Sequence, residues 1–357
     1  MVTTGTISRS PVETSRCDNS SNAFRILLTG ASGYLGQHIL ASLFQSSSHP
    51  EQHSYEIYAL YHRAEGFAAA VSTAAAQFPT TKVHVQALDL SDQRAVRDWF
   101  ARIPILDVCI HTAALSSPRT CQAQPELAHN SNCPKAFLDA LLEVRNTYVI
   151  ALSTDQVYDG TEPPYREDTP PEPCNVYGRT KLALEHHLLQ SNNCRTLILR
   201  SSIILGPRAP VLPEIAHETF LHFCATRQGV DTVFYRDEVR SVVSVHDVVA
   251  VILGLLASFR NGDTVPTGVY NMGGPTAVSR VDMAELVFEH LGYNPQHILA
   301  KDRAAVPPSA DSVPSPLNIA MDSSLLYQYT KRSFSSVKNM VESTFPKGSD
   351  GSTLQHV

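Results

Sequence analysis

A tyrosine and a lysine four residues apart are the residues of this sequence best suited to proton chemistry. Tyr177 and Lys181 flank Gly-Arg-Thr, and the stretch from Thr180 to Gln190 predicts a helix, so both side chains rise from one face. A free phenol loses its proton at about pH 10, and an ammonium group within a few ångströms lowers that pKa by stabilising the phenolate. The pair therefore predicts proton transfer near neutral pH.

A hydroxyl at the end of a predicted strand adds a third group. Residues 147–153 have the apolar run of a buried strand, and Thr154 follows directly. Its hydroxyl would give a substrate oxygen a second hydrogen bond beside that of Tyr177. The Tyr177 and Lys181 spacing also fits a tyrosine packed on the core beside a solvated lysine, so the surrounding elements must decide.

Three glycines follow the first apolar run of the chain. A strand-like segment from Phe24 leads into Gly30, Gly33 and Gly36, and an apolar-periodic stretch continues to Phe44. Strand, glycine turn and helix are the elements that a dinucleotide-binding loop requires, with amides at the helix start holding the phosphates. The spacing is GxxGxxG rather than the more familiar GxGxxG. The predicted cofactor-binding loop further includes Ser32, Tyr34 and Leu35.

The next predicted strand ends without a carboxylate. Residues 56–61 form this strand, and His62 and Arg63 follow where the adenosine ribose of a dinucleotide would lie. An NAD site usually has Asp or Glu there, whereas a guanidinium holds a 2'-phosphate bidentately. The sequence therefore favours NADP, with NAD as the alternative, and Arg63 also fits a surface loop.

The third predicted strand, residues 82–87, runs into Asp89 and Leu90. Asp89 is placed to accept a hydrogen bond from an adenine amino group, and it equally fits the cap of the following helix. Both residues are predicted to border the cofactor.

Two further strands complete an alternation of strands with helices. Residues 107–114 predict a strand that ends in a small-residue turn, and a helix is expected over residues 126–144. The rhythm predicts an α/β fold with a doubly wound parallel (Rossmann) sheet, whose ligand crevice lies at the carboxyl ends of the strands. Further cofactor-binding residues expected there are Thr112, Ala113, Ala114 and Asn130.

The chain divides into four predicted parts. After residue 200 prolines interrupt the pattern, with helices expected at 214–228 and 246–259 and strands at 232–235 and 269–271. These elements predict a smaller substrate-binding lobe over the crevice. The parts are a disordered leader (1–22), an NAD(P)-binding Rossmann domain (23–200), a lobe interleaved with it (mainly 201–345), and a disordered tail (346–357).

Composition excludes several classes of partner. The chain has 357 residues, with 34 acidic and 28 basic side chains, and no concentrated basic face, so neither nucleic acid nor an anionic membrane is expected. Its 7 cysteines lack metal-ligand spacing, which predicts reduced thiols and no metal site. No apolar run approaches the roughly 20 residues of a membrane helix. A cytoplasmic protein is expected, and homo-oligomers are compatible with the sequence.

Together these segments resemble the extended short-chain dehydrogenase/reductases, from about Phe24 to about Leu325. Within that family the chain most resembles the dTDP-4-dehydrorhamnose reductase branch, through residues 153–160, 163–170, 177–182 with Glu185, and 316–318 with Asp322. The wider resemblance rests on the glycine loop and on Asp89-Leu90, His111 to Ala114, Leu199-Arg200, Gly206-Pro207, Arg240 before Val245 to Val248, and Tyr270 to Gly273.

The branch resemblance implies NAD(P)H-dependent reduction of the 4-keto group of a nucleotide-linked deoxysugar. Tyr177 would give the proton, Lys181 would lower its pKa and bind the nicotinamide ribose, and Thr154 would hold the carbonyl. Asp155 would orient the sugar. Arg240 would bind a substrate phosphate, and its alternative is an ion pair with Asp237 or Glu238.

The same branch includes a protein that is not an enzyme. This is the NADP-binding regulatory beta subunit of methionine adenosyltransferase, which implies the catalytic subunit of that synthetase as a partner. The branch usually has Arg-Pro-x-Asn near the end, and here Ser315 takes the Arg position, so a charged contact to a nucleotide diphosphate is missing unless Arg240 replaces it. An epimerase or a dehydratase fits less well, since a dehydratase usually has Glu where Gln156 stands.

Overall fold

The computed structural model describes residues 23–347 except 47–54, 145, 192–194, 216–217 and 308–311. The predicted leader lies outside the described residues, as does the predicted tail from residue 348 onward.

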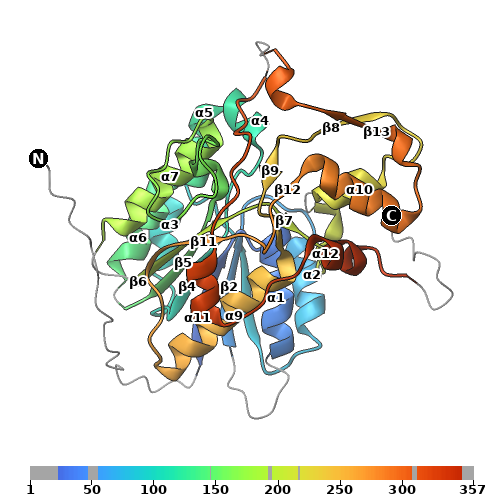
Figure 1. Cartoon of the computed structure of the whole chain (residues 1–357). Coiled ribbons are helices and arrows are strands. Elements are labelled where there is room, and N and C mark those ends of the chain that lie inside the picture. The colour runs from blue at the N-terminus through green and yellow to red at the C-terminus, as the bar shows by residue number, and fades with distance from the viewer. Residues whose placement is uncertain are drawn as a thin grey trace, which may run out of the picture.

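A seven-stranded parallel sheet forms the centre of the molecule (Figure 1). Its strand order is β11-β6-β5-β4-β1-β2-β3, and every neighbouring pair runs parallel. The predicted α/β, doubly wound parallel fold is therefore confirmed. The strands are β1 (Phe24–Thr29), β2 (Tyr55–Tyr61), β3 (Lys82–Ala87), β4 (Val108–His111), β5 (Tyr148–Thr154), β6 (Arg195–Ser201) and β11 (Gly268–Met272).

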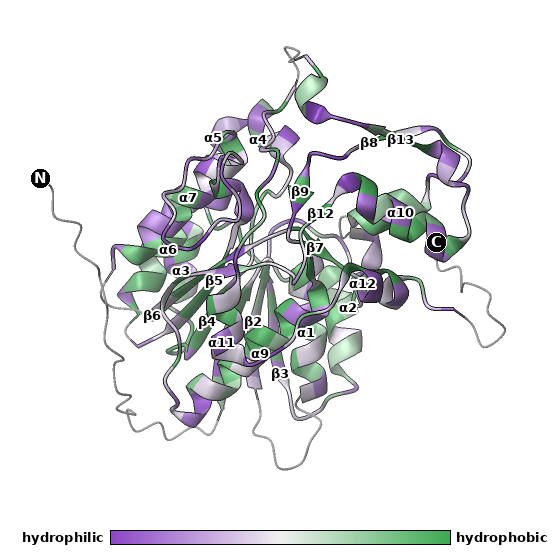
Figure 2. Ribbon diagram, in the orientation of Figure 1, coloured by the Kyte–Doolittle hydropathy of each residue, from purple (hydrophilic) through white to green (hydrophobic). Residues whose placement is uncertain are grey.

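Helices cover both faces of this sheet. Because successive side chains of a strand point to opposite faces, Ile26 and Leu28 of β1 pack into one apolar cluster and Leu27 into the other. One face carries α1 (Tyr34–Ser46), α2 (Phe67–Ala75), α9 (Val245–Asn261) and α11 (Ser324–Thr330), and the other α3 (Gln93–Phe100), α6 (Lys135–Glu143) and α7 (Val176–Leu189). The sheet strands are largely hydrophobic, while the helices present both kinds of residue (Figure 2).

A second group of elements builds a smaller lobe. Its apolar cluster includes Leu205, Val242, Met283 and Met340. Three short strand pairs contribute to the lobe: β7 (Ile204–Leu205) with β10 (Val243–Ser244), β9 (Val239–Arg240) with β12 (Val278–Ser279), and β8 (Thr232–Tyr235) with β13 (Ile298–Lys301). The helices are α8 (Phe220–Ala225), α10 (Arg280–Leu291) and α12 (Val337–Thr344).

The second half of the chain contributes to both groups. Strand β11 pairs with β6 at the edge of the large sheet, and α9 packs on α1. The boundary at residue 200 stays a prediction. Remaining elements are α4 (Pro118–Ala123), α5 (Pro125–Asn132), and the 3-10 turns η1 (Asp155–Val157), η2 (Pro213–Ile215), η3 (Pro295–His297) and η4 (Arg303–Ala305).

Three predicted helices have different bounds in the structure. The helix expected over residues 126–144 is divided into α5 and α6 at Pro134, because proline has no N–H with which to continue the ladder. Helix α7 begins at Val176, where the Asn175 side chain caps the Gly178 amide, so Tyr177 and Lys181 both lie in it. The helix expected over 214–228 is shorter, since α8 spans Phe220–Ala225.

Candidate active site

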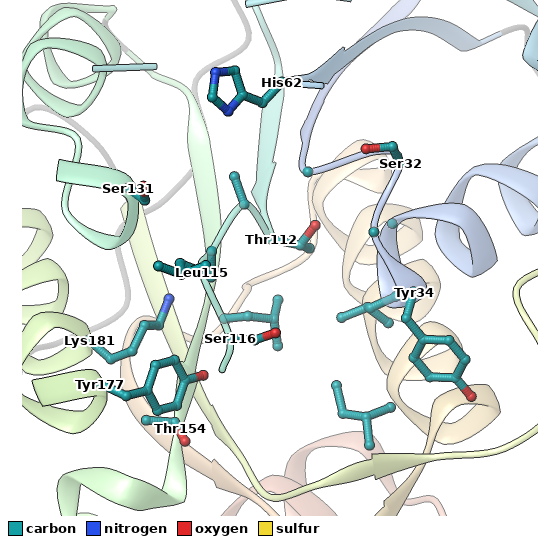
Figure 3. Close-up of a pocket in the computed structure, with 18 of the residues that line it drawn as sticks. Ser32, Tyr34, His62, Thr112, Leu115, Ser116, Ser131, Thr154, Tyr177 and Lys181 are labelled. Atoms are coloured by element: carbon teal, nitrogen blue, oxygen red, sulfur yellow. The ribbon is translucent and has the colours of Figure 1, made fainter. Parts of the chain in front are cut away.

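A cavity of about 730 Å³ lies at the carboxyl ends of the sheet strands (Figure 3). It is bordered by the β1–α1 loop, the ends of β2, β4, β5 and β6, the start of α7, and part of the smaller lobe. The structure brings together at this cavity every residue that the sequence predicted for cofactor binding, together with Thr154 and Asp155. The former are Gly30, Ser32, Gly33, Tyr34, Leu35, Gly36, His62, Arg63, Asp89, Leu90, Thr112, Ala113, Ala114, Asn130, Tyr177 and Lys181.

Gly30 in the β1–α1 loop and Gly36 in the first turn of α1 have no room for a side chain. A Cβ on Gly30 would lie 2.6 Å from the Ala113 nitrogen, and Gly30 has a positive φ of 70°. A Cβ on Gly36 would lie 2.1 Å from the Gly30 carbonyl oxygen. The loop and the start of α1 therefore stay close together, and the exposed Gly33 borders the cavity. This is a cradle that suits a pyrophosphate at a helix N-terminus.

The far end of the cavity gathers charged groups after β2 and β3. The His62 Nε2 lies 3.5 Å from Asp89 Oδ2, and Ser91 donates to Asp89 Oδ1 from both its amide and its hydroxyl. Hydrogen bonding by Ser91, with the charges of His62 and Arg63, holds the pKa of Asp89 below its ordinary value. Helix α3 is capped by Asp92 instead, and Asp89 borders the cavity.

Thr154, Tyr177 and Lys181 converge on one side of the cavity (Figure 3). Thr154 ends β5, whereas Tyr177 and Lys181 come from successive turns of α7. The Tyr177 hydroxyl and the Lys181 amine both point into the space that faces Ser32 of the glycine loop. The expected convergence of a phenol, an amine and a hydroxyl is thus present.

The pKa of Tyr177 is shifted in the direction opposite to the predicted one. Burial raises the pKa of Tyr177, and a hydrogen bond with Thr154 opposes this rise only in part. Burial lowers the pKa of Lys181 to about 8, against the opposing charge of Glu185. The expected lowering of the Tyr177 pKa by Lys181 is wrong for this structure, because loss of contact with water is the largest effect on both groups. Tyr177 carries its proton at neutral pH.

Asp155 is buried beside Thr154. Its Oδ2 accepts a hydrogen bond of 2.7 Å from the Ser202 hydroxyl, and its Oδ1 accepts one of 3.2 Å from Thr154. Burial raises the pKa of Asp155, and the charge of Arg240 opposes that rise. Asp155 therefore accepts the Thr154 hydroxyl hydrogen at the cavity wall.

Arg240 does not lie where a substrate-phosphate ligand was expected. It is 3 % exposed and does not border the cavity. Its Nη1 donates to the carbonyls of Val239 and Leu317 and its Nη2 to that of Pro316, each at 2.8 Å. The guanidinium is engaged by the backbone, because the segment after Ser315 folds against it.

The alternative ion pair for Arg240 is also wrong. Asp237 instead accepts hydrogen bonds from the amides of Arg303 and Ala304. Glu238 lies 3.6 Å from Arg280.

Several residues near the site were missed in the sequence. Asn132 is fully buried; its Oδ1 accepts from the Leu115 amide at 2.6 Å and its Nδ2 donates to Thr180 Oγ1 at 2.9 Å. It ties the loop after β4 to α7, while Asn130 borders the cavity. Nothing in a single sequence separates these two asparagines, because the rotation of α5 decides which one is buried. The lobe adds Ile203, Ile204, Glu218, Thr219 and Phe220 to the cavity wall.

The described residues contain neither a metal site nor a membrane-spanning helix. No group of His, Cys, Asp or Glu side chains in the described part of the chain is arranged to hold a metal ion. Among the same residues, no helix has the length and apolar character needed to cross a bilayer. Among the described cysteines, Cys109, Cys121, Cys133, Cys174 and Cys224, no disulfide is formed.

Known proteins are similar to this chain over most of its length. Methionine adenosyltransferase 2 subunit beta of Xenopus laevis is 28% identical over 320 residues, which covers 88% of this chain and 85% of that protein. Spore coat polysaccharide biosynthesis protein SpsK of Bacillus subtilis is 26% identical over 270 residues, covering 75% and 80% of the two chains.

Solved structures share the fold at lower identity. The dTDP-4-dehydrorhamnose reductase of Bacillus anthracis, in complex with NADP, has a TM-score of 0.67 at 18% identity, covering 91% of this chain and 98% of its own. MoeE5 in complex with UDP-glucose and NAD has a TM-score of 0.70 at 20% identity, covering 90% and 97%.

The family profile described as RmlD substrate binding domain matches residues 24–345, nearly all of the described chain. The motifs between the glycine loop and Asp322 had predicted this branch, and the match agrees with them. The chain belongs to the RmlD substrate-binding-domain family, within the extended short-chain dehydrogenase/reductases.

Proposed function

We propose that this protein is an NAD(P)H-dependent reductase of a keto group on a nucleotide-linked sugar, of the dTDP-4-dehydrorhamnose reductase type. The observation that carries the proposal is the convergence of Thr154, Tyr177 and Lys181 in the cavity that the glycine loop borders. Proton donor, hydrogen-bond donor and ammonium group thus share one space with a dinucleotide cradle. A carbonyl oxygen held there would have every group that its reduction requires.

The cradle fits NADP, with NAD as the alternative. The Gly30 and Gly36 positions leave room only for backbone, and the cavity is long enough to reach His62 and Arg63 after β2. Arg63 would hold a 2'-phosphate, Gly33 and Ser32 would border the pyrophosphate, and Lys181 would bind the nicotinamide ribose. A bound reduced dinucleotide would supply the hydride.

The protonation states support the reducing direction. Because the pKa of Tyr177 is raised, the phenol carries the proton that a carbonyl oxygen must receive when its carbon accepts a hydride. The Thr154 hydroxyl, which donates to Asp155 in this structure, would rotate toward the cavity when the substrate binds and donate the second hydrogen bond to that oxygen. Lys181, with a pKa of about 8, is an ammonium at neutral pH and stabilises the tyrosinate that forms.

Turnover with a 4-keto nucleotide sugar tests this function. We expect consumption of NADPH and a reduced sugar product, and Tyr177→Phe should abolish both. The matched control is Tyr293→Phe, because the Tyr293 hydroxyl donates to the Ala225 carbonyl in the smaller lobe, away from the cavity. Absence of turnover across a panel of carbonyl substrates, with correctly folded protein, would contradict the proposal.

A second candidate is a non-catalytic subunit that binds NADP and associates with the catalytic subunit of methionine adenosyltransferase. It is favoured by the similarity to the Xenopus laevis subunit beta. Ser315 at the usual Arg position, together with the engagement of Arg240 by backbone, also supports it. Size-exclusion chromatography of the mixed proteins tests it: co-elution supports the subunit role, and separate elution over a range of concentrations excludes it.

A further inference from the structure

A buried ionic cluster lies behind the three groups that would perform the chemistry. The Glu185 carboxylate accepts hydrogen bonds from Arg200 Nε at 3.1 Å and 3.2 Å, one on each oxygen, and from Arg200 Nη2 at 2.7 Å. The Ser153 hydroxyl donates to the same carboxylate. The Arg200 and Glu185 side chains are 5% and 1% exposed, so water does not compete for these contacts.

The cluster joins the elements that carry the catalytic candidates. Ser153 is the residue before Thr154 at the end of β5, and Glu185 lies one turn after Lys181 and two turns after Tyr177 on α7. Residues four apart on a helix share a face, and α7 packs on β5 and β6. The Ser153–Glu185 hydrogen bond therefore fixes the end of β5 against the face of α7 that holds Tyr177 and Lys181.

The same cluster continues toward the second half of the chain. Arg200 Nη1 donates to the Tyr158 hydroxyl at 3.0 Å, and that hydroxyl donates to Asn271 Oδ1 at 2.8 Å. Tyr158 lies just after η1, and Asn271 lies in β11. One chain of hydrogen bonds thus links β5, α7, β6, the segment after η1 and β11.

We propose that Ser153, Glu185 and Arg200 form a positioning network that sets the place of the Thr154 hydroxyl relative to Tyr177 and Lys181. The inference rests on the proposed reductase function. The three residues of the network do not themselves transfer a proton. They hold the strand end and the helix at one spacing, and in addition the Glu185 charge favours the ammonium form of Lys181.

A buried ion pair is poor evidence of a gain in stability, since taking both charges out of water offsets much of their attraction. An apolar pair would fill the same volume between α7 and β6. An apolar pair would not, however, accept the Ser153 hydroxyl or place a negative charge one turn from Lys181. These two contacts are the ones that distinguish a positioning role from a purely structural one.

Ser153→Ala tests the positional part. The substitution removes the hydrogen bond between Ser153 of β5 and Glu185 of α7 and leaves the Arg200–Glu185 pair intact. We expect kcat to fall about 10- to 100-fold, because small misplacements of reacting groups have effects of that order, while the KM for NADPH changes little. Ser153→Thr, which keeps the hydroxyl, should restore most of kcat.

The matched control is Thr147→Ala. Thr147 is a fully buried residue just before β5, and its hydroxyl donates to the Leu106 carbonyl at 3.0 Å. This variant loses one buried hydrogen bond at the other end of the same strand, so it should lose comparable thermal stability and keep kcat. Equal kcat values for Ser153→Ala and Thr147→Ala would overturn the positional part.

Glu185→Gln tests the electrostatic part without requiring turnover. Binding of NADPH, followed by its fluorescence, should weaken as the pH rises through the pKa of Lys181. Loss of the Glu185 charge should move the midpoint of that weakening to lower pH. An unshifted midpoint would contradict this part of the network's role.

The binding measurement also separates the network from the proposed function. If the wild-type protein binds NADPH but turns over no carbonyl, the reductase function fails, while the shift of the midpoint still supports or contradicts the network.

Discussion

Arg240 donates hydrogen bonds to the carbonyl oxygens of Pro316 and Leu317, the two residues that follow Ser315. The side chain expected to bind a substrate phosphate therefore holds the segment in which the family's usual arginine is replaced by serine. The Arg240 guanidinium is thus engaged by the chain's own backbone, and Ser315 has no charge. Under the proposed function, other groups at the cavity would bind the substrate diphosphate.

We expect Arg240→Met to act on stability. The substitution removes three hydrogen bonds of the guanidinium; the Leu317 and Val239 carbonyls keep the amides of Val239 and Ile319, and the Pro316 carbonyl loses its Arg240 donor. We expect a loss of about 3 kcal/mol in the free energy of unfolding. Chemical denaturation measures this loss, with Arg236→Met as control, because Arg236 pairs with Asp302 in an exposed position. Unchanged stability with a raised KM would instead return Arg240 to the role of a phosphate ligand.

The pH dependence of reduction should follow Lys181. Its pKa is lowered by burial to about 8, so the ammonium is present below that pH and is lost as the pH rises through it. We expect kcat to be level near neutral pH and to fall above about pH 8. Lys181→Arg keeps a positive charge at all these values, so the residual rate of that variant should show no such fall. A profile of kcat against pH for both proteins decides the point.

Arg63 should set the preference between the two dinucleotides. Its guanidinium follows β2, where a 2'-phosphate would lie, and a charge-assisted contact of this kind contributes about 1.5 to 3 kcal/mol. Arg63→Ala should therefore weaken NADPH binding by about 10- to 100-fold and leave NADH binding nearly unchanged. Fluorescence titrations with both dinucleotides measure the effect. Equal weakening for both would show that Arg63 does not contact the 2'-phosphate.

Two glycine-to-alanine substitutions should have opposite results. A methyl group on Gly36 would lie 2.1 Å from the Gly30 carbonyl, whereas one on Gly254 in α9 has nothing within 4 Å. Gly36→Ala should displace the glycine loop and abolish dinucleotide binding. Gly254→Ala should bind normally and gain up to about 1 kcal/mol, since alanine is the better helix former. Thermal melts with and without NADP compare the two; normal binding by Gly36→Ala would contradict the close packing of the loop.

Lowering the pH should destabilise the fold, in part because Glu56 becomes protonated. Burial opposes the charged form of this carboxylate, but hydrogen bonds from Lys82, His84 and Arg25 lower its pKa from 4.5 to about 2. A group with a depressed folded pKa stabilises the protein above its unfolded pKa, and that contribution is lost between about pH 4.5 and pH 2. Glu56→Gln should cost on the order of 2 to 3 kcal/mol at pH 7 and less at pH 3. Urea denaturation at the two pH values measures the difference; Asp98→Asn, at an exposed helix pair, should show little change.

Local patterns in the sequence were sufficient for the parallel sheet and for most of the cavity. Local backbone geometry explains this result for three features. They are the apolar run before Gly30, the three glycines, and the four-residue spacing of Tyr177 and Lys181. A strand that leads into a tight turn and a helix needs few distant partners to define its shape. Parallel strands then bring their carboxyl ends to one edge, and the residues after each strand meet there.

Tertiary structure alone decided the rest. Whether Asn130 or Asn132 is buried depends on how α5 rotates against α7, and the engagement of Arg240 depends on a segment more than seventy residues away. The raised pKa of Tyr177 follows from burial by neighbours of several elements. The sequence by itself determined which groups could act and at which sheet edge they lie. The protonation states of these groups, and the hydrogen bonds that they can still make, were set by long-range packing. The reason is that the exclusion of water from a site depends on every element that covers it.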